Sequence, residues 1–127
     1  MKTLTIFLFI LLYTTSCKKD DIEPNQQILG KWEVFYLGNG EYRLPIQNPT
    51  GYQHFLPDSV LLEYDYATKI TYTKKYWIDS LLHTAIQRED GRWFTFDFDC
   101  QFKGDTMRLE RKNVSAIFNV SKHKRIN

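Results

Sequence analysis

Apolar and polar side chains alternate in short runs from residue 28 to residue 122. In the clearest run, residues 92–102, every second position is apolar: Phe94, Phe96, Phe98, Cys100 and Phe102. The intervening positions are mostly polar and include Asp97 and Asp99. A period of two over this length predicts a half-buried antiparallel strand whose phenylalanine face meets the core.

Seven further strands are predicted by similar patterns and by the turn residues that separate them. They cover residues 28–37, 52–55, 60–66, 70–78, 81–88, 106–112 and 114–122. Residues 41–51 contain Pro45 and Pro49 and are predicted as a long loop with a short extended piece at residues 42–44. Within residues 60–66 the pattern places Tyr64 and Tyr66 on the inward face and the carboxylates on the other.

Eight short strands without a convincing helix predict an all-β fold. Full closure of the sheet would remove its exposed edges, so a small antiparallel up-and-down eight-stranded barrel is favoured over a sandwich. The barrel is expected to span residues 28–122, and the basic residues 123–127 are expected to form a frayed tail. The interior of an eight-stranded barrel holds packed side chains or one small ligand.

An apolar segment precedes this domain and ends at Cys17. Lys2, the apolar residues 4–13 and the small polar residues 14–16 have the order of a secretory signal that is too short to span a bilayer comfortably. The segment resembles the signals of bacterial lipoproteins, although Thr14 stands where an aliphatic residue is usual. The resemblance implies a signal peptide over residues 1–16 and acyl chains, such as palmitate, on Cys17. The alternative is an ordinary signal peptide cut near Ser16.

Residues 17–27 are charged and polar and contain one proline, which predicts a flexible tether. Their Lys-Lys-Asp-Asp run resembles the export tag of Bacteroidetes-type lipoproteins that are displayed on the outer surface. The resemblance implies an outer-membrane lipoprotein, in either the periplasmic or the surface leaflet. Two or more acyl chains on Cys17 would anchor it stably. The alternative is a solvated linker of mixed charge.

The net charge and the length of the chain limit the kinds of partner that we expect. The chain has 17 Lys and Arg against 15 Asp and Glu, so nucleic acid is not an expected partner. The residues after the signal suffice for one domain, which is expected to be a monomer.

If Cys17 is lipidated, Cys100 lacks a disulfide partner. Its place on the phenylalanine face predicts a buried, unreactive thiol with a raised pKa.

Three short motifs occur in the first half of the domain: Leu-Gly-Lys-Trp-Glu-Val at 29–34, Phe-Leu-Pro-Asp at 55–58 and Glu-Tyr-Asp-Tyr at 63–66. Together they resemble the lipocalin-like domain of Bacteroidetes envelope lipoproteins over residues 28–122. The resemblance implies that Gly30 and Trp32 are structural, with the tryptophan closing the bottom of a barrel. Ser59 stands where glycine is usual, and the lipocalin disulfide and paired loop motifs are missing from the sequence.

Candidate catalytic chemistry is sparse. Asp97 and Asp99 would lie about 7 Å apart on one strand face, a spacing that a glycosidase pair uses, but acids on a solvated strand face are the simpler interpretation. His54, His83 and His123 lie far apart in the sequence and form no metal motif. Neither enzymatic activity nor a cofactor is expected.

Aromatic residues predicted to face inward are the candidates for ligand binding. They are Trp32, Tyr64, Tyr72, Phe94, Phe96, Phe98 and Phe118. If they meet they fill the barrel, and if they stand apart they form an apolar cup for a small hydrophobic molecule. Trp77 and Trp93 fall on outward faces, where they would mark a contact with a glycan or a protein. Two functions stay open: a barrel that binds a hydrophobic ligand, and a non-catalytic protein that presents loops to an envelope partner or inhibits a foreign protein.

The sequences Asp-Ser-Val, Asp-Ser-Leu and Asp-Thr-Met lie at predicted turns, with Ser59, Ser80 and Thr106 as their central residues. They resemble the O-glycan acceptors of Bacteroidetes envelope proteins, which implies modification at these hydroxyls. Asp-Ser is also ordinary turn chemistry, so a plain turn is the alternative at each position.

Overall fold

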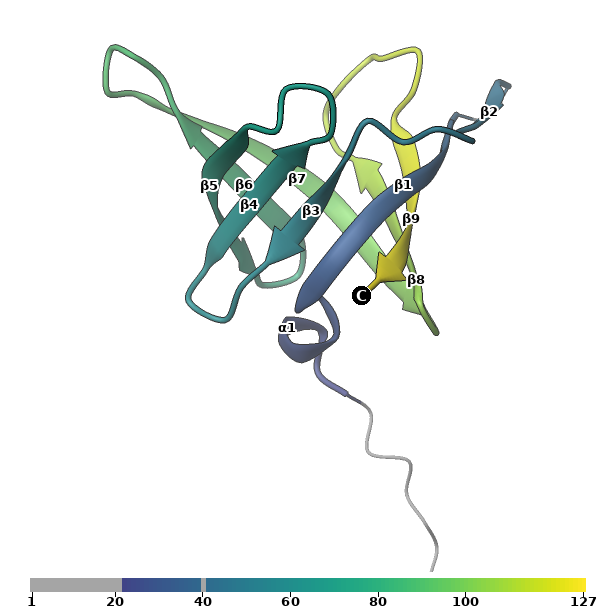
Figure 1. Cartoon of the computed structure of the whole chain (residues 1–127), viewed down its shortest axis with the longest axis horizontal. Helices are drawn as coiled ribbons and strands as arrows, with labels where there is room; N and C mark the ends of the chain where they lie inside the picture. The colour runs from purple at the N-terminus through teal and green to yellow at the C-terminus, as the bar shows by residue number, and fades with distance from the viewer. Residues whose placement is uncertain (1–21, 40) are drawn as a thin grey trace, which may run out of the picture.

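The computed structural model describes residues 22–39 and 41–127, so the predicted signal peptide, Cys17 and the first part of the tether lie outside the described residues. This part of the chain forms one short helix and nine strands (Figure 1). They are α1 (Pro24–Gln27), β1 (Gly30–Gly38), β2 (Arg43–Pro45), β3 (Gly51–Phe55), β4 (Val60–Asp65), β5 (Thr71–Ile78), β6 (Leu82–Gln87), β7 (Trp93–Lys103), β8 (Thr106–Arg111) and β9 (Val120–Ile126).

The strands close into an eight-stranded antiparallel barrel, which confirms the predicted fold. Each strand from β3 to β9 pairs with the next, β3 pairs with the start of β1, and β9 pairs along β1 to complete the ring. The additional strand, β2, pairs with residues Tyr36–Gly38 at the other end of β1 and lies in the predicted long loop. Because the sheet closes, β1 has no long unpaired edge. The removal of such edges was the reason for predicting a barrel rather than a sandwich.

One end of the barrel is closed by the segment that enters it. Ile28 and Trp32 are fully buried, and the indole nitrogen of Trp32 donates a hydrogen bond to the carbonyl of Ile28 at 2.7 Å. α1 lies below this end (Figure 1). The prediction of a flexible tether is therefore wrong for residues 24–27, because Pro24 has the fixed φ that suits the first position of a helical turn. The buried apolar core gathers here: Ile28, Trp32, Phe55, Leu61, Tyr76, Leu82, Met107 and Leu109.

The last strand differs from its prediction. The predicted strand at residues 114–122 and the predicted frayed tail at 123–127 are both wrong, since β9 is Val120–Ile126 and pairs with both β1 and β8. Its inward positions are Ser121, His123 and Arg125, which are polar, so the hydropathy pattern does not reveal them. Residues 112–119 form a loop instead, and Phe118 lies exposed in it.

β4 has the predicted alternation but the opposite orientation. Leu61 is fully buried in the core, so Glu63 and Asp65, which share its face, point into the barrel. Tyr64 and Tyr66 therefore point outward, contrary to the prediction. Tyr64 stacks there on Tyr52 of β3 with ring centres 5.2 Å apart.

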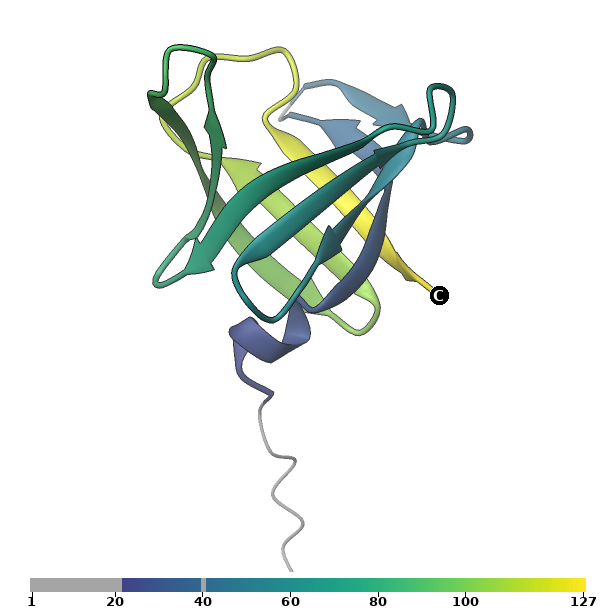
Figure 2. The ribbon, with the colours of Figure 1, turned by 60° about the vertical axis from the view of Figure 1, so that its left-hand side comes forward.

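The end opposite α1 carries the longer connections (Figure 2). They comprise residue 39 and residues 41–50, which include β2, together with residues 66–70, 88–92 and 112–119. Several large apolar side chains on and beside these connections are exposed, among them Ile117 at 72% and Phe94 at 43%. Within residues 22–39 and 41–127 there is no helix with the length and apolarity to cross a membrane.

Candidate functional site

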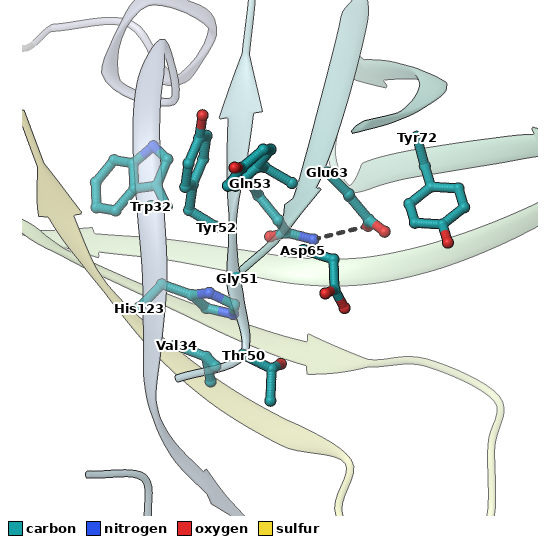
Figure 3. Close-up of a pocket in the computed structure, with 11 residues that line it drawn as sticks. Trp32, Val34, Thr50, Gly51, Tyr52, Gln53, Glu63, Asp65, Tyr72 and His123 are labelled. Carbon is teal, nitrogen blue, oxygen red and sulfur yellow. Dashed lines mark hydrogen bonds between the residues drawn. The ribbon is translucent and has the colours of Figure 1, made fainter. Parts of the chain in front are cut away.

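Two adjoining cavities occupy the space inside the barrel above the apolar core, here called the lumen. The first has a volume of about 280 Å³, and Trp32, Gln53, Glu63, Tyr72 and His123 lie on its walls (Figure 3). The second has a volume of about 260 Å³ and shares Gln53 and Glu63 with the first. The barrel is thus packed at its closed end and hollow beyond it.

One wall of the lumen is polar and comes from three neighbouring strands. Gln53 of β3 lies opposite Glu63 of β4, and its amide nitrogen donates to the Glu63 carboxylate at 3.2 Å (Figure 3). Lys74 of β5 forms an ion pair with the other carboxylate oxygen of Glu63 at 2.8 Å. The Glu63 carboxylate therefore binds Gln53 and Lys74 at once. Because the amide nitrogen of Gln53 donates to Glu63, its amide oxygen has no partner among the described residues.

Two buried polar atoms on this first cavity have no hydrogen-bond partner among the described residues. They are the amide oxygen of Gln53 and Nδ1 of His123. The other ring nitrogen of His123 lies 2.8 Å from the hydroxyl of Ser121. Burial lowers the pKa of His123 to about 4, so the ring is neutral at pH 7. Buried polar atoms of this kind are costly unless a water or a ligand satisfies them.

The facing wall of the lumen combines aromatic rings with a cation. Phe96 and Phe98 of β7 line the second cavity, together with Arg111 from the end of β8. The guanidinium of Arg111 lies 4.6 Å from the centre of the Phe96 ring, a distance typical of a cation–π contact. Arg111 stands opposite Phe98 in the β7–β8 pairing, which places both on the lumen face.

The barrel wall is open beside β5. The β5–β6 pairing covers only Lys75–Ile78, although β5 begins at Thr71, so the first half of β5 has no ladder partner on that side. A cavity of about 640 Å³ lies at this opening and is bordered by Glu63, Tyr72 and Lys74 from the lumen and by Trp93 from the outer face. The lumen therefore has a lateral opening between β5 and β6.

The aromatic residues predicted to bind a ligand are only partly brought together. Phe96 and Phe98 line the second cavity, and Trp32 and Tyr72 border the first. Phe94 is exposed near the rim, the end of the barrel opposite α1. The guanidinium of Arg88 lies 4.6 Å from the centre of the Phe94 ring. The ring of Tyr64 lies on the outer face, although Tyr64 borders the first cavity, and Phe118 lies in an exposed loop.

Sequence reasoning missed the polar half of the lumen, namely Gln53, Glu63, Lys74, Arg111 and His123. Except for His123, each lies on a strand at the same parity as a buried apolar residue, as Gln53 does with Phe55 and Glu63 does with Leu61. That parity was the available signal, but it becomes decisive only once the strand registers are known.

The other residues considered from the sequence have clear places. Asp97 contacts His83, whose Nδ1 lies 2.6 Å from its carboxylate, on the outer face beside Trp77. Cys100 is a free thiol that is partly buried against the core, and burial raises its pKa to about 12, which is the predicted direction. Trp77 and Trp93 are exposed on outward faces, also as predicted.

The three predicted glycan acceptors lie toward the closed end. Ser59 and Ser80 are exposed in the connections after β3 and β5, whereas Thr106 is half-buried as the first residue of β8. Ser59 has a φ of 63°, the left-handed conformation for which glycine is usual. Its hydroxyl is thus accessible at a turn that keeps the glycine geometry.

Among the described residues there is no group of three or more His, Cys, Asp or Glu side chains positioned to hold a metal ion. Neither a scan of protein-family models nor a search of curated proteins gives a match to this chain.

Proposed function

We propose that this protein is a lipid-anchored, lipocalin-like binding protein whose lumen takes one small molecule with an apolar body and polar groups. The observation that carries the proposal is the hollow half of the barrel, where an aromatic wall faces a polar wall with unpartnered buried atoms. A cavity with a few convergent polar groups is the usual form of a small-molecule site. The sequence-based expectation of a purely hydrophobic ligand is widened accordingly.

The placement of the chain ends supports the anchoring part of the proposal. The short helix α1, which begins two residues after Ile22, lies at the closed end of the barrel (Figure 2). An acylated Cys17, five residues before Ile22, would hold that end near the outer membrane. The rim and the opening beside β5 would then face away from the bilayer or along it. The protein would act as a monomer, in either leaflet.

Native mass spectrometry of the protein extracted in detergent from its own host tests both parts. We expect the measured mass to equal that of the chain from Cys17 onward plus acyl chains. We also expect a small molecule to be released when the protein is denatured. A mature chain without lipid would refute the anchor. Extra sugar mass on peptides containing Ser59, Ser80 or Thr106 would support glycosylation there.

A matched pair of variants tests whether the retained molecule occupies the lumen. Thr84 is buried on the second cavity, and Thr95 lies exposed on the outer face of the adjacent strand. Thr84→Phe should fill the cavity and abolish retention, whereas Thr95→Phe should retain the molecule. Equal retention by both variants would contradict a lumen site.

A second function, presentation of loops to an envelope protein, is favoured by the exposed apolar residues of the 112–119 loop. Ile117 is 72% exposed and Phe118 lies beside it. Exposed apolar side chains that cluster in this way mark protein contacts. Ile117→Ser combined with Phe118→Ser should then abolish co-purification of a stoichiometric partner and leave small-molecule retention unchanged.

A further inference from the structure

The charges on the second lumen cavity do not cancel. Its charged residues are Lys74, Arg111 and Glu63. Lys74 and Glu63 form an ion pair at 2.8 Å, which accounts for one charge of each sign. No ion pair or side-chain hydrogen bond within the described part of the chain includes Arg111. The cavity therefore carries one positive charge that no residue of its wall balances.

Other arginines of the barrel show how this differs from the common arrangement. Arg108 lies on the outer face of the same strand and donates to Glu110 at 3.0 Å. Arg125 donates to two backbone carbonyls at the closed end. Arg111 instead presents its guanidinium to the Phe96 ring and to the cavity. The contact with the Phe96 ring leaves the N–H groups of Arg111 without a side-chain partner among the described residues, so they are available to a carboxylate, sulfonate or phosphate.

We propose that Arg111 binds the anionic group of a flat organic anion whose apolar body lies against Phe96 and Phe98. This inference rests on the proposed function and specifies the class of ligand that the lumen takes. The free amide oxygen of Gln53, which also borders this cavity, is an acceptor for a hydroxyl or N–H group on the same molecule. The lumen is thus a site for an amphipathic aromatic acid rather than for a neutral lipid.

Two fluorescent probes that share one ring system separate charge from apolar binding. 8-Anilinonaphthalene-1-sulfonate carries the anion, and N-phenyl-1-naphthylamine lacks it. Both should bind the wild-type protein. Arg111→Gln should raise the Kd of the sulfonate about tenfold or more, since a charge-assisted hydrogen bond contributes that much, and should change the Kd of the neutral probe less than about twofold on the same scale.

Arg108→Gln is the matched control, because it removes a cation from the outer face of the same strand. It should leave both dissociation constants unchanged. If Arg111→Gln does not fold, Arg111→Lys and the salt dependence of the wild type replace it. Sulfonate binding should then weaken with added salt and with lysine, while binding of the neutral probe should not.

The outcomes distinguish the two levels of the proposal. If neither probe binds the wild type, the proposed binding function itself fails. If both probes bind and Arg111→Gln weakens neither or weakens both equally, the lumen binds ligands but Arg111 is not an anion site. If Arg108→Gln weakens the sulfonate as much as Arg111→Gln does, the sulfonate responds to surface charge, and the inference is overturned.

Discussion

The guanidinium of Arg125 lies 4.3 Å from the centre of the Trp32 ring, at the closed end of the barrel. The two residues come from the last and the first strands of the barrel, which pair directly at this position. Arg125 also donates hydrogen bonds to the carbonyls of Leu29 and Gln27, at 2.5 and 2.7 Å. One side chain thus joins the end of the chain to the segment that closes the barrel.

Replacing Arg125 by lysine should destabilise the barrel. Lysine keeps the charge but loses the planar fork that serves two carbonyls and the stacking on Trp32. We expect the free energy of unfolding to fall by about 1–3 kcal/mol, measured by urea denaturation. Lys124→Met is the control, because Lys124 is exposed and, among the described residues, forms only a long ion pair with Glu33 at 3.6 Å. Equal effects of the two substitutions would argue against the Arg125 contacts.

Gly30 begins β1 under the same arginine. Its φ is 114°, and a Cβ added there would lie 2.9 Å from Nη1 of Arg125. Gly30→Ala should therefore cost backbone strain and also displace Arg125, for a loss of about 2–4 kcal/mol in the free energy of unfolding. Gly91→Ala has a φ of 83° but open space around the added Cβ, so it isolates the strain alone. A larger loss in Gly91→Ala than in Gly30→Ala would contradict this account.

His83 should stabilise the fold more strongly as the pH falls toward 6. Its pKa is raised, chiefly by the hydrogen bond to Asp97 and further by Asp79, so the protonated ring bridges two carboxylates. The stabilisation is fully present below the pKa of about 6.5 that histidine has in an unfolded chain, and it is lost as the pH rises through the higher pKa of the folded state.

The measurement is the free energy of unfolding from pH 5.5 to pH 9 for the wild type and for His83→Gln. The difference between them should be largest at the acidic end of that range and should shrink at the alkaline end. Asp97→Asn should lose most of the same dependence. A constant difference across the range would show that His83 acts without its charge.

His123 should act in the opposite sense. Burial lowers its pKa to about 4, so the folded state resists a proton that the unfolded chain accepts below about pH 6.5. Its contribution to stability falls as the pH drops from 6.5 toward 4, by up to roughly 3 kcal/mol. Relative to His123→Gln, the wild type should lose stability on acidification. A parallel pH dependence of the two proteins would contradict the buried neutral ring.

Much of the architecture follows from the sequence because its turns and its period of two are local. β7 is the clearest case, since five apolar residues at alternate positions leave one interpretation of which face is buried. The other six barrel strands from β1 to β8, the place of Cys100 on the core face and the outward Trp77 and Trp93 follow in the same way. Local patterns of this kind do not depend on which strands become neighbours.

The tertiary structure decided the lumen and its closure. β4 contains three consecutive apolar residues, Val60, Leu61 and Leu62, so the sequence does not decide which face of this strand is buried. The pairing of Gln53 with Glu63 across β3 and β4 turns the carboxylates inward. β9 carries polar inward residues whose burial depends on partners about 90 positions earlier, as Arg125 does on Trp32. Hydropathy along the chain reports the average cost of burying a side chain, whereas the partners that offset this cost for Glu63, Lys74 and Arg125 exist only after the barrel has closed.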